Sequence, residues 1–246
     1  MKNLLKFEYH KLFTSKVFYI CCILSAALVG VYAITTNELL GSTASNYPTA
    51  DFVVKIMNNS YISIILAIFI AIFACSDFTH ETTKVILSKG YSRQNIFLSK
   101  LICVLSASLI MFICSIIIAF IIGTTTYAYT GISTSLFKIL CVQAIIILAF
   151  SSLFFMVSMI LKKAGSAIAI NIVSTTIISV LLMVINQVLN IKKFSLDSYW
   201  LGSLFSNVSA ISVSHELLMR GLVCSIIYII CFIIIGFFVF KSNEKL

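Results

Sequence analysis

Side chains that commonly perform catalysis are few in this chain and lie far apart in its sequence. The three histidines are His10, His80 and His215, and His215-Glu216 is not followed by the second histidine of a zinc-peptidase motif. Neither a G-x-S-x-G nucleophile elbow nor a G-x-x-x-x-G-K-[ST] phosphate-binding loop occurs. The sequence therefore predicts that the chain is not an enzyme and holds no metal or cofactor of its own. If the protein uses ATP, another subunit must bind it.

Charged side chains gather instead in residues 77–100, a polar segment between two long apolar runs. The segment holds two acidic and four basic residues, which are Asp77, Glu81, Lys84, Lys89, Arg93 and Lys100. Gly90 is placed to end one helix in the left-handed conformation, and Ser92 is placed to cap the next. The pattern predicts a helix, a tight turn and a second helix.

Four side chains of this segment recur with helical spacing and predict one contact face. They are Phe78, Thr82, Val85 and Ile86. We expect the helix that carries them to continue directly from the preceding apolar run. From the residues alone, the face either contacts a soluble partner or belongs to a solvated hairpin, and both interpretations stay open.

The elements that must position this segment are transmembrane helices. The chain of 246 residues is 61% hydrophobic and 10% charged, with a mean hydropathy of +1.12, which is typical of an integral membrane protein. A bilayer core requires about 20 helical residues. Six charge-free runs are long enough, with the longest ending in an exposed loop near residues 124–131; they are 17–37, 56–76, 101–137, 139–161, 164–191 and 221–240. Their continuous hydrophobicity excludes a β-barrel. We predict a single all-α domain, 1–246, with six transmembrane helices.

Lysine and arginine predict the orientation of these helices. Twelve of the 17 basic residues precede the first run, follow the last one, or lie in residues 77–100 and 162–163. Basic loops stay in the cytosol, so both termini and residues 77–100 are predicted to be cytosolic. The net charge of +9 reflects this pattern and contact with anionic lipid, and it does not indicate nucleic acid binding.

Two flanking segments carry predictions of their own. Residues 1–16 place Leu5, Tyr9, Leu12 and Phe13 on one helix face, which predicts a helix lying in the cytosolic interface. The alternative is a basic start with incidental leucines. The longest exterior segment, 192–219, combines aromatic residues with serines, which suits either a re-entrant segment or an ordinary interfacial loop.

No charged residue lies within the six runs, which argues against a secondary transporter or pump. Uncharged polar and small residues there predict either helix packing or a weakly polar substrate surface; they are Gln143, Gly165, Ala169, Asn171 and Asn186. Gly165 and Ala169 form a small-x-x-x-small pair, which lets helices approach closely. The eight cysteines show no C-x-x-C spacing, so neither disulfides nor zinc are expected.

Residues 77–100 resemble, without a gap, the cytosolic loop of the ABC-2 type permeases, the membrane subunits of bacterial ABC exporters. The positions that carry the resemblance are Asp77, Thr82, Val85-Ile86-Leu87, Gly90, Ser92-Arg93, Ile96-Phe97 and Lys100. Glu8 and Lys11 are similar to the Glu-x-x-Lys of the family's N-terminal interfacial helix. The sequence departs from the pattern at Asp77, where Glu is commoner, at Glu81, where Gly is common, and at Gly90, which replaces the usual Pro.

The resemblance implies a half-transporter in the bacterial cell membrane. A second permease subunit, identical or different, would complete it, and a separate ABC subunit would bind ATP and Mg. The expected coupling residues are those of the 77–100 segment, and the expected substrate is an amphipathic or hydrophobic molecule, namely an antimicrobial peptide, a drug or a lipid. The compact chain looks most like the bacteriocin-immunity group. The alternative is a stand-alone secondary transporter or channel without an ATPase partner; a membrane-embedded enzyme and a purely structural or sensory subunit are further rivals.

Overall fold

Six helices of the computed structural model are long and apolar enough to cross a bilayer. They are α2 (Lys16–Leu40), α4 (Tyr61–Thr79), α6 (Arg93–Thr126), α7 (Thr134–Leu161), α8 (Ala164–Leu189) and α10 (His215–Ser242). The shorter elements are α1 (Lys2–Thr14), α3 (Thr49–Met57), α5 (Thr82–Ser88), the 3-10 turn η2 (Leu196–Tyr199) and α9 (Leu201–Val208). The structure describes residues 2–40, 49–57, 61–79, 82–126, 134–189, 196–208 and 215–242, and these contain no strand. The prediction of a multi-pass helical membrane protein is confirmed.

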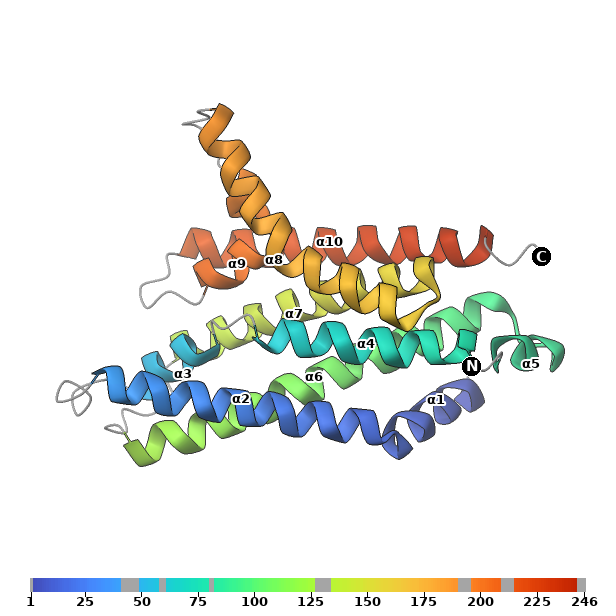
Figure 1. Ribbon diagram of the computed structural model, residues 1–246, viewed down its shortest axis with the longest axis horizontal. Helices are drawn as coiled ribbons and strands as arrows, with labels where there is room; N and C mark the ends of the chain where they lie inside the picture. The colour runs from blue at the N-terminus through green and yellow to red at the C-terminus, as the bar shows by residue number, and fades with distance from the viewer. Residues whose placement is uncertain are drawn as a thin grey trace.

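Apart from α8, whose second half turns away from the bundle, the long helices run roughly parallel to one axis, and the two ends of the bundle differ (Figure 1). One end, called here the α5 end, carries α1, α5, the turn between α7 and α8, and the last turn of α10. The opposite end, the α9 end, carries α3, α9 and the start of α10. The elements at each end therefore come from distant parts of the sequence.

Apolar helix packing forms the core of the bundle. α7 packs against α10, α4 and α6, while α4 also packs against α8 and α2. Phe97 of α6 lies at the centre of an aromatic group, with ring centroids 5.4 Å from Phe155, 5.7 Å from Phe237 and 5.8 Å from Phe240. Such aromatic pairs contribute beyond the area they bury, and this group joins α6, α7 and α10 near the α5 end.

Two short helices fill space between the long ones at the α9 end. Five residues of α3 are fully or almost fully buried, namely Phe52, Val53, Val54, Ile56 and Met57. α9 buries Leu201, Leu204, Phe205 and Val208 and packs against α7 and α10. Phe205 shares a small cavity with Ile147 and Phe150, which lie near the middle of α7. The described part of 192–219 therefore packs its apolar side chains against the long helices, and its two sequence interpretations both stay predictions.

The elbow between α5 and α6 follows the chemistry expected of its residues. Gly90 has a φ of 83°, in the left-handed region, and its N–H donates to the Leu87 carbonyl at 2.9 Å. Ser92 caps α6, because its Oγ accepts a hydrogen bond from the N–H of Asn95 at 3.4 Å. α4 is described as far as Thr79 and α5 from Thr82, so the expected continuation of the helix falls on residues 80–81, which lie outside the described residues.

Replacing Gly90 with alanine tests whether the elbow depends on the positive φ of this residue. A Cβ built at Gly90 meets no heavy atom within 4 Å, so any loss of stability comes from placing an L-residue at positive φ. We expect Gly90→Ala to lower the free energy of unfolding by about 1–2 kcal/mol, measured by thermal unfolding of the purified chain in detergent. Gly165→Ala is the matched control, because Gly165 is helical and equally uncrowded. An equal effect of both changes would contradict the assignment.

Candidate functional site

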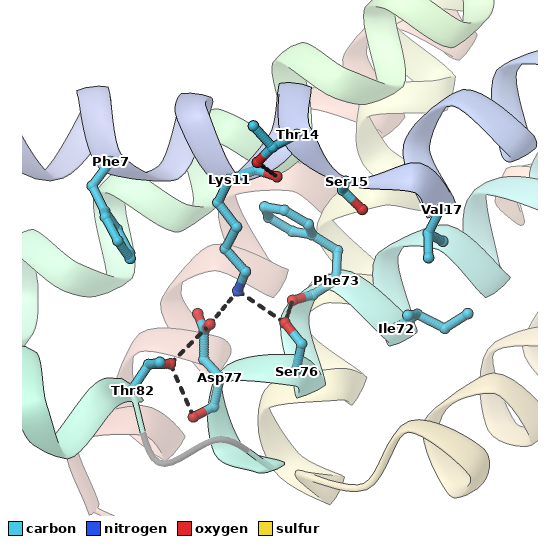
Figure 2. A pocket seen from close by; sticks show the side chains of 10 residues that line it. All are labelled: Phe7, Lys11, Thr14, Ser15, Val17, Ile72, Phe73, Ser76, Asp77 and Thr82. Carbon is cyan, nitrogen blue, oxygen red and sulfur yellow. Dashed lines mark hydrogen bonds and ion pairs between the residues drawn. The ribbon is translucent and has the colours of Figure 1, made fainter.

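Asp77, near the end of α4, joins four helices at the α5 end. One carboxylate oxygen pairs with the Lys11 ammonium of α1, and the other pairs with the Lys100 ammonium of α6. The Thr82 hydroxyl of α5 donates to Asp77 Oδ1 at 3.0 Å, and Lys11 also donates to Ser76 Oγ at 2.9 Å. Figure 2 shows the Lys11 side chain reaching from α1 toward Asp77 and Ser76, with Thr82 on the other side of the carboxylate.

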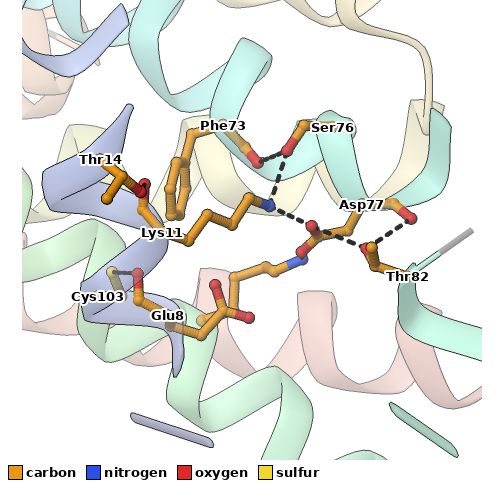
Figure 3. Close-up of polar contacts among 9 residues, drawn as sticks. Glu8, Lys11, Thr14, Phe73, Ser76, Asp77, Thr82 and Cys103 are labelled. Carbon is orange, nitrogen blue, oxygen red and sulfur yellow. Dashed lines mark hydrogen bonds and ion pairs between the residues drawn. The ribbon is translucent and has the colours of Figure 1, made fainter. Parts of the chain in front are cut away.

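Burial makes this cluster unusual. Asp77 and Lys100 are each 3% exposed, and Glu8 of α1 is 1% exposed. Two carboxylates and two ammonium groups balance, so no net charge is buried. Glu8 extends from the same helix as Lys11 (Figure 3), and its Oε2 has no hydrogen-bond partner among the described residues. Burial lowers the pKa of the Lys11 ammonium below its ordinary value, while the neighbouring Glu8 carboxylate raises it.

Aromatic rings surround the cations. The Lys11 ammonium lies 5.0 Å from the ring centroid of Phe73, and the Lys100 ammonium lies 6.0 Å from that of Phe78. Lys162 lies in the turn between α7 and α8, has a φ of 57°, and places its ammonium 5.8 Å from the centroid of the Phe78 ring. Cations are attracted to ring faces, so Phe78 lies between a buried and a more accessible lysine and brings the α7–α8 turn to the cluster.

A cavity of about 410 Å³ opens beside the Lys11–Asp77 pair, between α1 and the ends of α4 and α5. Its walls include Phe7, Val17 and Ile72, with Thr14 and Ser15 at the turn between α1 and α2. The ion pairs and hydrogen bonds of the described cluster link α1, α4, α5 and α6 to one another.

Six of the predicted site residues come together here, which are Glu8, Lys11, Asp77, Phe78, Thr82 and Lys100. Sequence reasoning named all six without indicating that the α1 pair meets the other four. It missed Ser76, Phe73 and Lys162. Helical spacing offered a signal for Phe73, because residues four apart share a face and Phe73 precedes Asp77 by one turn.

The interfacial face predicted for the N-terminal helix stays a prediction, and the structure shows which face of α1 meets the bundle. α1 buries Leu4, Glu8 and Leu12, whereas Phe13 is 48% exposed. Hydrophobic spacing alone selected the neighbouring face with Phe13. Glu8 and Lys11 both turn inward. The buried Lys100 ammonium attracts the Glu8 carboxylate, and the Asp77 carboxylate attracts the Lys11 ammonium.

The predicted contact face of the 77–100 segment is divided. Thr82 bonds to Asp77, and Phe78 and Ile86 pack against the core, while Val85 is 54% exposed. Asp77 and Lys100 are buried and do not form part of an outer surface. Gly90, Ser92 and Arg93 form the elbow. Lys84 belongs to α5, and Glu81 lies outside the described residues.

The polar residues predicted in the spans lie apart from this cluster. Gln143 is buried in α7, and Asn171 of α8 is buried with its amide donating to the Ala67 carbonyl of α4 at 3.4 Å. Asn186 is half-buried in the last turns of α8. Gly165 and Ala169 are exposed, so they do not pack α8 within this chain; Ala164 and Ala167, on the adjacent face, pack toward Ala71 and Cys75 of α4.

A family model described as protein of unknown function (DUF2705) matches residues 18–244. The chain belongs to the DUF2705 family. The match includes Asp77, Thr82 and Lys100, while Glu8 and Lys11 precede it. A comparison with curated proteins finds no match for this DUF2705 chain.

Removing the Asp77 charge tests the cluster. Asp77→Asn leaves two lysines facing each other in a dry environment, and we expect a loss of about 3–5 kcal/mol in the free energy of unfolding. The measurement is thermal unfolding in detergent. Asp77→Asn combined with Lys100→Met should recover part of this loss, because the uncompensated buried ammonium is then absent.

Glu216→Gln is the matched control for this prediction. Glu216 is an exposed carboxylate in the first turn of α10, and its change should leave stability within about 0.5 kcal/mol. A similar small effect for Asp77→Asn would rule out a structural role for the ion pairs.

Proposed function

We propose that this protein is the membrane-spanning permease subunit of an ATP-driven exporter in the bacterial cell membrane, with the α5 end in the cytosol. A separate ABC subunit binds ATP and Mg, and a second permease subunit, identical or different, completes the transporter. The substrate is an amphipathic or hydrophobic molecule. Six spanning helices and the α5–Gly90–α6 elbow are consistent with this architecture.

The attachment of α5 to Asp77 carries the proposal. α5 is a short helix whose Thr82 bonds to the same carboxylate that holds α1 and α6. A partner that displaces α5 therefore acts on α1, α4 and α6 through one residue. Rigid-body switching between packed states requires such joints. A solvated hairpin without a partner would not need a buried, charge-balanced anchor.

The outer surface available to the partner consists of the side of α5 and the elbow that faces away from the bundle. Val85, Ser88 and Lys89 are exposed there, whereas Ile86 and Leu87 pack inward. The exposed Val85 and Lys89 give this surface an apolar and a cationic component. We propose that these two residues contact the ATP-binding subunit.

One observation favours the second candidate, a stand-alone transporter driven by an ion gradient. The candidate spans extend further than the charge-free runs, so Asp77 and Lys100 lie at or inside their ends. Buried ionisable groups in spans often mark ion pathways. Here they neutralise one another in ion pairs, which supports an anchoring role over proton or ion transfer.

The orientation is tested by cysteine labelling with a reagent that does not cross membranes. We expect Lys89→Cys, at the α5 end, to react only after the cells are permeabilised, and His215→Cys, at the α9 end, to react in intact cells. Both positions are exposed: Lys89 directly follows α5, and His215 is the first residue of α10. The unsubstituted chain provides the background from its own cysteines. Labelling of Lys89→Cys in intact cells would overturn the proposal.

The coupling surface is tested by charge reversal. We expect the protein, purified in mild detergent from its native cells, to retain an ABC ATP-binding subunit, identified by mass spectrometry and ATP hydrolysis. Val85→Asp with Lys89→Glu should reduce the retained subunit about tenfold, because apolar and electrostatic contact are both lost. Lys6→Glu, another exposed lysine at the same end, should change nothing. Substrate transport that persists with no ATPase present would favour the gradient-driven candidate.

A further inference from the structure

A groove of about 360 Å³ separates the middle of α8 from α9. The residues that line it are Thr175, Thr176, Ser179, Gly202, Ser203 and Ser206. Three come from α8 and three from α9, so two successive helices build one polar hollow. Among the described residues around it, the exposed surface of α8 is strongly apolar, which makes this hollow distinct from its surroundings.

Four of the five hydroxyl groups that line the groove already donate their protons to backbone carbonyls. Thr175 and Thr176 donate to the Ile172 carbonyl at 2.8 Å and 3.1 Å, and Ser179 donates to the Thr175 carbonyl at 3.3 Å. Ser206 donates to the Ser203 carbonyl at 2.9 Å. A hydroxyl has one proton and two lone pairs. These four side chains therefore offer hydrogen-bond acceptors to anything that enters.

One unused donor lies at the same place. A Cβ built on Gly202 would lie 2.7 Å from Ser179 Oγ and 3.7 Å from Trp200 Nε1, so the bare face of Gly202 lies between an acceptor and an indole N–H. Trp200 Nε1 is buried and has no hydrogen-bond partner among the described residues. A buried donor left unsatisfied is costly. Glycine therefore lets α9 approach Ser179 and the Trp200 ring closely, because a Cβ there would overlap Ser179 Oγ.

The charge of the groove lining limits which chemical groups the groove can bind. The lining consists of neutral residues only. A cation would lose hydration there without a counter-charge, which is strongly unfavourable in an apolar environment. An uncharged amide avoids that cost, since it carries no net charge and its N–H can donate to the hydroxyl oxygens of the groove.

We propose that the α8–α9 groove binds an uncharged amide group of an amphipathic molecule. The apolar part of that molecule lies along the exposed side of α8, where Val173, Ile177 and Val180 are 43%, 48% and 60% exposed. As a site for a transported molecule, the groove rests on the proposed permease function. As a binding site, it is a property of this chain alone.

Trp200 is the only tryptophan of the chain and reports binding directly. The full chain in nanodiscs is titrated with dodecanamide, with N,N-dimethyldodecanamide, which keeps the carbonyl but lacks N–H, and with dodecylammonium. We expect a saturable change in Trp200 fluorescence with dodecanamide and about tenfold weaker binding of the other two. Equal binding of the dimethyl compound, or tighter binding of dodecylammonium, would overturn the proposal.

The variant Thr176→Val with Ser179→Ala removes two acceptors while keeping the shape of the helix. Both hydroxyls bond only within α8, so the variant should fold normally. We expect about tenfold weaker binding of dodecanamide. Ser166→Ala, which removes a similar intrahelical hydroxyl away from the groove, should bind normally. Unchanged binding by the double variant contradicts the assignment.

The binding measurements use the chain without a partner, so a negative result for amide binding can be told apart from a negative result for the permease proposal. Absence of an ATP-binding subunit would leave amide binding intact, and absence of amide binding would leave the coupling surface untouched. The amide ligand can be a lipid of the membrane or a freely diffusing amphipath. Titrations in nanodiscs with and without amide-containing lipids distinguish these two sources. Competition by such a lipid assigns the groove to a membrane component, and its absence assigns the groove to a freely diffusing amphipath.

Discussion

The pairing of Asp77 with two lysines sets the arrangement of the α5 end. Moving an ion from water into an apolar interior is costly, so each buried charge requires a partner at contact distance. Asp77 meets that requirement for Lys11 and Lys100 at once, and this is possible only if α1, α4 and α6 come together around it. Thr82 completes the shell and fixes where α5 begins. Hydrophobic packing alone would allow α1 several positions on the bundle, whereas ion pairing selects one.

Hydrophobicity and turn chemistry were sufficient to predict the six spanning helices and the elbow. The apolar runs are long, and Gly90 and Ser92 each have a local conformational reason for their place. The inward face of α1 was not predictable in the same way. It is decided by contacts between residues 65 or more positions apart, such as Lys11 with Asp77, and no local periodicity reports such contacts. Gly165 and Ala169 illustrate the same limit, because a small-residue spacing does not say which side of a helix meets its neighbour.

The middle of α8 is organised by neutral polar groups rather than by ions. Ser174, Thr175 and Thr176 all donate to carbonyls of the preceding turn, a pattern that often bends helices. Figure 1 shows α8 leaving the bundle in its second half, where Val180, Leu181 and Val188 are exposed. Together with α9, which enters from the other side, this departure creates the hydroxyl-lined groove. Sequence reasoning noted Asn171 and Asn186 in this helix but had no means to place α9 against it.

The length of α6 has a mechanical consequence. Its 34 residues extend without interruption from the elbow at Arg93 to Thr126, and at 1.5 Å per residue this corresponds to roughly 51 Å, well beyond a hydrocarbon core of about 30 Å. A continuous helix resists bending more than a jointed one. Tilting its base by a few degrees therefore sweeps its far tip sideways, in proportion to the distance from the pivot. Because α6 touches both α1 and α3, it connects the short helices at the two ends of the bundle, and it can convert a small push at one end into a larger displacement at the other.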